Sequence, residues 1–178
     1  MSEYGRLVTL DTMEFRRIFP APPEKVWEFW VDPEKRKLWF CGGSTDGREG
    51  GELVFAFDHT RLSESPPPQK YACEEVAEHN ARILAWDPPH RLAFTWFESQ
   101  GDMSSEVDVR FTATEDGQTE LHLVHTGLVG RDMLIGVFAG WHGHFDLLAE
   151  VLVGDRTTDF WIRDQELEAI YAERVPEG

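Results

Sequence analysis

The stretch GWHGHFDLLAEVLVG, residues 140–154, places a tryptophan and two histidines in one short apolar segment. Histidine can bind a metal or exchange a proton near neutral pH, and tryptophan offers a large apolar wall to a ligand. His142 and His144 are two residues apart, so on a regular helix, which turns about 100° per residue, they point about 200° away from each other. They cannot chelate one metal ion from such a helix, and we expect two partly exposed histidines on the flanks of the helix instead of a metal site.

Two other polar residues, His125 and Arg17, are predicted to lie on the apolar face of a strand. His125 shares a face with Leu121 and Leu123 under the two-residue period of a strand. It is either a satisfied core histidine bonded to a backbone carbonyl, or a group that orients a ligand oxygen or transfers a proton. Arg17 shares its face with Phe15, and a buried arginine needs an acidic partner, solvent or a ligand because an isolated buried charge is costly. We expect Arg17 to form a structural ion pair at the edge of the sheet.

No motif of nucleophilic or phosphate-binding chemistry accompanies these residues. The sequence contains no GxSxG, no P-loop and no Rossmann fingerprint, and the glycines of GGSTDGREGG lack the required order of strand and helix. An enzyme of the cyclase or hydratase type would depend on His125 as acid or base, with Arg17 or His59 stabilising an oxyanion. We expect a binding protein in preference to such an enzyme, with no cofactor and no metal.

The charge balance excludes some classes of partner. The 178 residues include 17 Lys and Arg against 33 Asp and Glu, which gives a formal net charge of −16. A nucleic-acid binder needs a basic face, and an acidic chain is repelled by anionic membranes. No apolar run is long enough to cross a bilayer. We therefore expect neither nucleic acid nor membrane as a partner.

Cysteine usage indicates the compartment. Cys41 and Cys73 are the only cysteines, neither belongs to a CxxC motif, and no targeting segment precedes them. We expect reduced thiols in a cytoplasmic protein, with a disulfide between the two as the alternative.

Periodicity gives the order of the elements that must position these side chains. A strand over residues 13–19 is followed by two short helices that begin at Pro23 and Pro33, the second capped by Asp32. A glycine-rich loop then leads to a series of antiparallel strands. These are predicted in the segments 52–59, 72–86, 92–98, 104–114 and 119–128, with Val107, Val109, Phe111 and Ala113 turned inward in the fourth.

The longest helical pattern runs from about Arg131 to Val153 and stops at Gly154. Its apolar stripe follows a three-four spacing through Leu134, Phe138, Trp141, Phe145, Leu148 and Leu152. A sheet with one apolar face needs a cover, and this helix is the only element with enough apolar surface. We therefore predict an α+β fold, a curved antiparallel sheet wrapped around a long C-terminal helix, with an extra helix in the segment DFWIRDQELEAIYAE.

The rings that these periods turn inward predict a cavity between the sheet and the long helix. Core packing is the usual role of any single aromatic residue, but large rings on a curved sheet leave a gap that a ligand can fill. We expect a small hydrophobic ligand, with His125 as its polar contact. The predicted ring walls are Trp39, Phe55, Phe57, Trp96, Phe111, Phe138, Trp141 and Phe145.

Several segments in the same order resemble one known family. FPAPPEKVWEFWVDPEKRKLWF resembles the APxxxVWxAWTDPExxxxWW opening of proteins related to the activator of the heat-shock protein 90 ATPase. ARILAWDPPHRLAFTW, TELHLVHTGL and GWHGHFDLLAEVL are similar to later segments of that family, so the match runs from about Phe15 to Gly154. The resemblance implies the START/Bet v 1-like superfamily, also called SRPBCC or polyketide cyclase-like, and its helix-grip fold. Members of this superfamily bind lipids, polyketides, hormones or cofactors, and some catalyse cyclisation or hydrolysis.

The resemblance divides the chain into a START/Bet v 1-like domain, residues 1–154, and a C-terminal helical extension, residues 155–178. Trp39–Phe40 replaces the tryptophan pair that is usual in the family. The extension either caps the cavity or forms a dimer contact, for which Phe160, Trp161 and Ile170 would supply an exposed apolar face. A co-chaperone-like or dimeric interaction module is therefore a further alternative to ligand binding and to catalysis.

Overall fold

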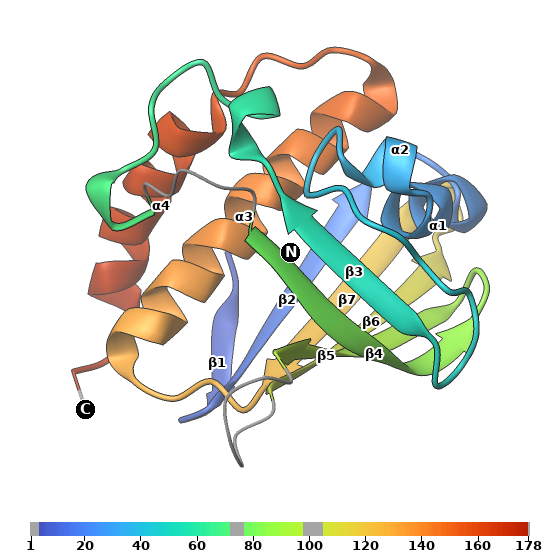
Figure 1. Cartoon of the computed structure of the whole chain (residues 1–178), viewed down its shortest axis with the longest axis horizontal. Coiled ribbons are helices and arrows are strands. Elements are labelled where there is room, and N and C mark those ends of the chain that lie inside the picture. The colour runs from blue at the N-terminus through green and yellow to red at the C-terminus, as the bar shows by residue number, and fades with distance from the viewer. Residues whose placement is uncertain (1–3, 72–76, 98–104, 178) are drawn as a thin grey trace.

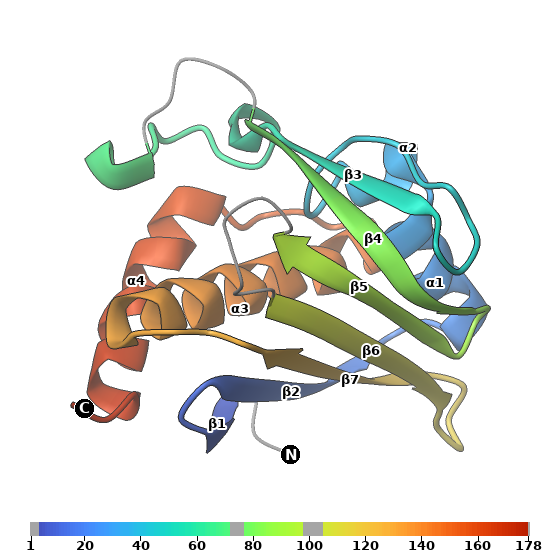
Figure 2. The same cartoon turned by 60° about the horizontal axis from the view of Figure 1, so that its bottom comes forward.

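Seven antiparallel strands form one curved sheet, and a long helix lies along its concave face (Figures 1 and 2). The computed structural model describes residues 4–71, 77–97 and 105–177. In the sheet the strands follow the order β1-β2-β7-β6-β5-β4-β3. Their bounds are β1 Arg6–Thr9, β2 Thr12–Phe19, β3 Glu52–Phe57, β4 Ala77–Asp87, β5 Arg91–Phe97, β6 Ser105–Ala113 and β7 Thr119–Thr126. The predicted α+β architecture is confirmed.

Strand β6 shows the predicted alternation except at its end, whereas β5 does not alternate, because Ala93 and Thr95 are buried together with Leu92 and Phe94. In β6, Val107, Val109 and Phe111 are buried, whereas Ala113 is exposed because the strand ends there. The short strand β1 was not predicted, since its four residues are mostly exposed and carry no alternation. Residues 72–76, which include Cys73, lie outside the described residues, so the start of the second predicted strand in that series is not tested.

Two short helices close one end of the sheet, as the sequence predicts. Helix α1 is Pro23–Val31 and helix α2 is Pro33–Arg36. The Asp32 carboxylate caps α2 by accepting a hydrogen bond from the backbone N–H of Glu34 at 2.8 Å. Trp30 reaches from α1 into the core and stacks on Trp141, with the ring centroids 5.8 Å apart.

A buried arginine that the sequence analysis did not single out fixes the loop after α2. Arg36 is 1% exposed, and its guanidinium donates to the carbonyl groups of Gly42, Gly43 and Val54 at 3.0–3.1 Å. Burying a cation costs less when every N–H finds an acceptor. The clamp holds the loop against β3, and Phe40, which begins the loop, is thereby held in the core.

The long helix α3, Arg131–Val153, is covered on both sides. It ends at Gly154, whose φ of 78° is the left-handed conformation that glycine adopts at helix ends. Helix α4, Phe160–Arg174, crosses the outer side of α3 (Figure 2). The approach is close, because a Cβ atom at Gly143 would lie 3.3 Å from the Phe160 ring.

The position of α4 corrects two expectations. Phe160 and Trp161 are buried and Ile170 is half-buried, so these residues form no exposed apolar face for self-association. His142 and His144 are 1% and 3% exposed, and are not the partly exposed flank residues that we expected. The reason is the same in both cases. Helix α4 packs on α3 with Phe160 against His144 and Tyr171 against His142, so both histidine flanks of α3 and the apolar residues of α4 are removed from solvent.

Two substitutions on α4 test how much this packing contributes. Leu167 is fully buried between the helices, whereas Ile162 on the same helix is 53% exposed. Replacing Leu167 by Ala should lower the free energy of unfolding by about 2–5 kcal/mol, because it leaves a cavity. Ile162→Ala should change it by less than about 0.5 kcal/mol. Urea denaturation checks both, and equal effects would contradict the burial of α4 on α3.

Candidate functional site

One pocket lies between the first half of α3 and the β3–β5 side of the sheet. Its volume of about 310 Å³ is at the lower end of the range of roughly 300–1,000 Å³ that small-molecule sites occupy. The lining is mostly apolar, and its residues are Phe40, Phe57, Tyr71, Trp96, Asp132, Met133, Gly136, Val137, Gly140, Trp141 and His144. The concave, ring-lined shape is suited to an apolar guest.

Helix α3 forms one wall of this pocket, and two of its lining residues are glycines. Its lining residues recur every three or four positions from Met133 to His144, so they share one face of the helix. A Cβ atom at Gly140 would meet no atom within 4 Å, and one at Gly136 would lie 3.3 Å from the Tyr71 hydroxyl. The space above the helix therefore exists because these two positions carry no side chain.

Aromatic rings form the opposite walls. Phe40 stacks on Trp141 with centroids 5.3 Å apart and on Trp96 with centroids 6.1 Å apart, and it meets Phe57 edge to face. Trp96 and Trp141 also contact each other at 5.3 Å. Interlocked rings have few alternative rotamers, so they hold the shape of the pocket when it is empty.

The C-terminal helix positions Tyr71 at the mouth. The Tyr71 ring, 38% exposed, stacks on Trp161 with centroids 5.4 Å apart. Its hydroxyl donates to the carboxylate of Glu168 at 3.0 Å. Partial burial and the charge of Glu168 raise the pKa of Tyr71, so the phenol keeps its proton and stays a donor. Helix α4 thus takes part in the site through this side chain.

His125 lies in the core and does not line the pocket. The Trp141 indole N–H donates to its Nδ1 at 3.2 Å, and its Nε2 lies 3.3 Å from the Ser105 hydroxyl. Burial lowers its pKa to about 3, so the ring is neutral at pH 7. Of the two roles left open by the sequence, this geometry matches the satisfied core histidine, with a hydroxyl in place of the expected carbonyl.

Arg17 forms an ion pair, although not at the sheet edge. Its guanidinium donates to Asp146 at 2.9 Å, and Asp146 also accepts from Arg163 at 2.8 Å. The expected location is wrong because β1 pairs outside β2 and takes the edge. The charges instead join β2, α3 and α4, away from the pocket.

His59, the remaining oxyanion candidate, follows β3 in a short 3₁₀ turn, His59–Arg61. Its ring stacks on Phe57 with the planes 5° apart, and burial lowers its pKa to about 4. It lies behind the pocket wall, next to His144 at a centroid distance of 5.4 Å.

The rings predicted to surround a ligand divide into two groups. Phe57, Trp96 and Trp141 line the pocket. The other five pack in the adjoining core and are at most 2% exposed; they are Trp39, Phe55, Phe111, Phe138 and Phe145.

Two wall residues, Phe40 and His144, were missed by the sequence analysis. Phe40 lies in a loop without periodicity. His144 belongs to a second helical stripe that contains Gly136 and Gly140, and this glycine spacing was the available signal.

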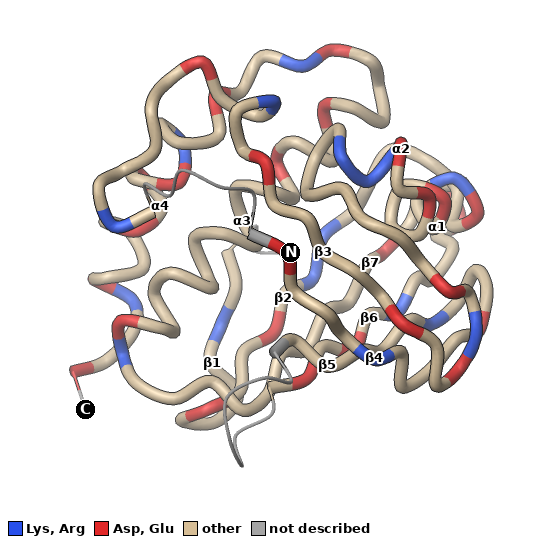
Figure 3. The backbone as a smooth tube through the Cα atoms, in the orientation of Figure 1, with Lys and Arg blue, Asp and Glu red and all other residues tan. Residues whose placement is uncertain are grey.

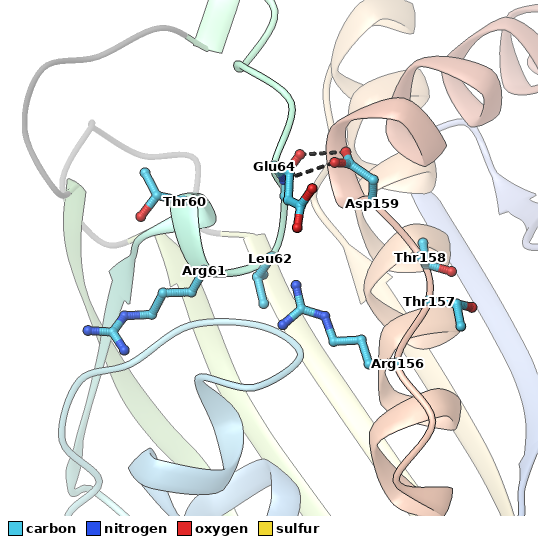
Figure 4. A pocket seen from close by; sticks show the side chains of 9 residues that line it. Thr60, Arg61, Leu62, Glu64, Arg156, Thr157, Thr158 and Asp159 are labelled. Carbon is cyan, nitrogen blue, oxygen red and sulfur yellow. Dashed lines mark hydrogen bonds between the residues drawn. The ribbon is translucent and has the colours of Figure 1, made fainter.

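A second, larger hollow of about 560 Å³ is polar and has a structural explanation (Figure 4). It lies between residues 60–64 and residues 156–159. The Asp159 carboxylate accepts from the Ser63 hydroxyl and from the backbone N–H of Glu64, which ties the loop to the start of α4. Figure 4 shows Arg61 pointing away from Arg156, so the two guanidinium groups do not converge on one point. We interpret this hollow as the junction where the loop is hydrogen-bonded to the start of α4.

The described part of the chain gives little support for a reactive cysteine, a metal site, a membrane-spanning helix or a basic surface. Cys41 is a free, buried thiol whose pKa is raised to about 12 by burial, and Cys73 lies outside the described residues. Within residues 4–71, 77–97 and 105–177 there is no cluster of three metal-ligating side chains and no helix with the length and apolarity to cross a bilayer. In Figure 3, Lys and Arg are scattered among the more numerous Asp and Glu residues.

The curved sheet around a long helix, with a pocket between them, defines a helix-grip protein. Residues 20–153 match the family model described as "Activator of Hsp90 ATPase homolog 1-like protein". The chain therefore belongs to this family, within the START/Bet v 1 superfamily. A search of curated proteins finds no match to the chain.

Solved structures resemble the chain over nearly its whole length. The protein encoded by gene BPP1335 of Bordetella parapertussis is 32% identical, with a TM-score of 0.79 over 97% of this chain and 90% of that one. CalU16 of Micromonospora echinospora is 29% identical, with a TM-score of 0.67 over 93% and 89% of the two chains. EF2215 of Enterococcus faecalis, at 16% identity and a TM-score of 0.67 over 97% and 91%, shows the same fold.

The buried neutral state of His125 predicts a pH dependence of stability. Its pKa falls from an ordinary 6.5 to about 3 on folding, so between these values the unfolded chain binds a proton that the folded chain does not. This contribution to stability is complete above pH 6.5 and is lost as the pH falls. When the pH is lowered from 7.5 to 5, the free energy of unfolding of the wild type should decrease by about 2 kcal/mol more than that of the His125→Gln variant.

Denaturant titrations at a series of pH values measure this difference. Between pH 7.5 and 8.5 neither state binds the proton, so the difference between the two proteins should stay constant there and serves as the control. If the free energy of unfolding falls by the same amount in the wild type and in His125→Gln between pH 7.5 and pH 5, His125 is not buried as a neutral ring.

Proposed function

We propose that this protein binds a small hydrophobic molecule in the pocket between α3 and the β3–β5 side of the sheet. The observation that carries the proposal is the ring-lined hollow of about 310 Å³ above Gly136 and Gly140. Membership of a helix-grip family supports it in general terms, since that fold is suited to holding apolar molecules between helix and sheet. A cytoplasmic site of action is supported by the free Cys41 thiol, because reducing compartments keep cysteines unpaired.

The size of the pocket sets the affinity to be expected. A two-ring aromatic compound that loses about 200 Å² of apolar surface gains roughly 5 kcal/mol at about 25 cal/mol per Å². Ring stacking adds about 1 kcal/mol, and lost translational freedom offsets part of the sum. We therefore expect binding of a simple two-ring probe in the micromolar to millimolar range. A natural ligand with additional polar contacts would bind more tightly.

The proposal predicts that a side chain at position 140 blocks the pocket. A leucine there meets no clash at its Cβ and extends into the hollow, so Gly140→Leu should weaken the binding of 2-naphthol at least tenfold. The variant should remain folded, and its helix should be more stable, since glycine is disfavoured in helices by about 1 kcal/mol. Titration followed by amide chemical shifts in two-dimensional NMR measures the affinity.

Gly140→Ala is the matched control. It gives the same gain in helix propensity but adds only one methyl group, so it should retain most of the affinity. If Gly140→Leu binds 2-naphthol as well as the wild type does, the ligand occupies another place and the proposal is wrong.

A further inference from the structure

His144 is the one histidine that lines the pocket. Its Nδ1 lies 2.7 Å from the backbone carbonyl oxygen of Trp39, so this nitrogen carries the proton and donates it. The other nitrogen, Nε2, is then an acceptor. Among the described residues no group donates a hydrogen bond to it, although the side chain is almost completely buried and lines the hollow. An acceptor that borders a cavity takes its hydrogen bond from the occupant, which is either water or a ligand with a donor group.

The surroundings hold this ring in one orientation. Phe160 of α4 stacks on it with centroids 4.3 Å apart, and Phe40 meets it edge to face at 4.8 Å. Burial and the neighbouring His59 ring lower the pKa of His144 well below its ordinary value, so it stays neutral. The pocket thus presents a fixed lone pair and no charge at this point.

Two potential donors in the wall are already engaged. The Trp141 indole N–H is directed to His125, and the Tyr71 hydroxyl donates to Glu168. At the mouth, Asp132 adds an exposed carboxylate, and the whole chain carries a formal charge of −16. An anionic guest would therefore lose its hydration and meet negative charge, whereas a neutral guest with a hydroxyl group would satisfy His144.

We propose that the pocket selects an uncharged aromatic molecule that bears a hydroxyl group, and that the hydroxyl donates to Nε2 of His144. The inference rests on the proposed function and adds the chemical class of the ligand. The sequence suggested His125 as the polar contact of the ligand. In this proposal His144 takes that role, and it lies about one helical turn after Trp141 on the side of α3 that faces the pocket.

Three probes of similar size test the proposal on the wild-type protein at pH 7. They are 2-naphthol, 2-methoxynaphthalene and 2-naphthoate, which offer a hydroxyl donor, a capped oxygen and a carboxylate. We expect 2-naphthol to bind about threefold to tenfold more tightly than 2-methoxynaphthalene, the difference that one hydrogen bond makes. The carboxylate should bind more weakly than both.

A variant and a spectroscopic readout assign the preference to His144. In His144→Phe, which keeps an aromatic ring against Phe160, the ratio of the two affinities should fall to about one. His59→Phe, behind the wall, should keep the wild-type ratio. Because His144→Phe also leaves the Trp39 carbonyl without its donor, the ¹⁵N resonance of Nε2 in the wild type gives an independent measurement. It should move on addition of 2-naphthol and not on addition of 2-methoxynaphthalene.

The outcomes separate this inference from the proposed function. Equal binding of 2-naphthol and 2-methoxynaphthalene, or tighter binding of 2-naphthoate, would overturn the selection by His144 and leave a general apolar pocket. Binding of none of the three probes would overturn the proposed function, and the inference with it.

Discussion

The structure depends on the burial of α3 from two directions. The concave sheet covers one side of the helix and α4 covers the other, so nearly all residues from Phe138 to Leu148 are removed from water. Burial on this scale stabilises the fold but demands that each side chain find a partner of matching shape. At Gly136 and Gly140 there is no side chain to match, and the cover leaves a hollow. The candidate site is thus a consequence of how the core is assembled.

The three buried histidines illustrate how this cover constrains polar groups. His125 is bonded to Trp141 and Ser105, and Nδ1 of His142 is hydrogen-bonded to the Tyr171 hydroxyl at 2.9 Å. Burial lowers the pKa of all three rings and keeps them neutral, although the Asp146 carboxylate, 3.7 Å from Nε2 of His142, partly opposes the shift at that ring. Of these three, only His144 lines the pocket, whereas Nε2 of His142 is buried without a hydrogen-bond partner. The two histidines of the GWHGH segment therefore have different surroundings on opposite flanks of α3.

Much of the architecture could be predicted from the sequence because strands and helices leave different apolar periods. The alternation in β6 as far as Phe111, the Asp32–Pro33 helix start and the Gly154 helix end are local signals, and each of them is confirmed. The partners of an element leave no local signal. The burial of His144 depends on α4, which follows it by more than a dozen residues, and the place of Phe40 depends on the Arg36 clamp. For the same reason some of the predicted rings lie in the core and not in the pocket wall. The two-residue period of a strand shows which side chains point inward. It does not show whether the interior around them is filled or leaves a pocket.

The central claim is that a guest molecule occupies the space above the two glycines of α3. The most direct measurement is a set of intermolecular nuclear Overhauser effects between bound 2-naphthol and the isotope-labelled protein. We expect contacts from the probe to the Hα atoms of Gly136 and Gly140 and to the rings of Trp96 and Trp141. Contacts confined to the polar hollow beside Arg156, or to exposed side chains such as Leu10, would contradict it.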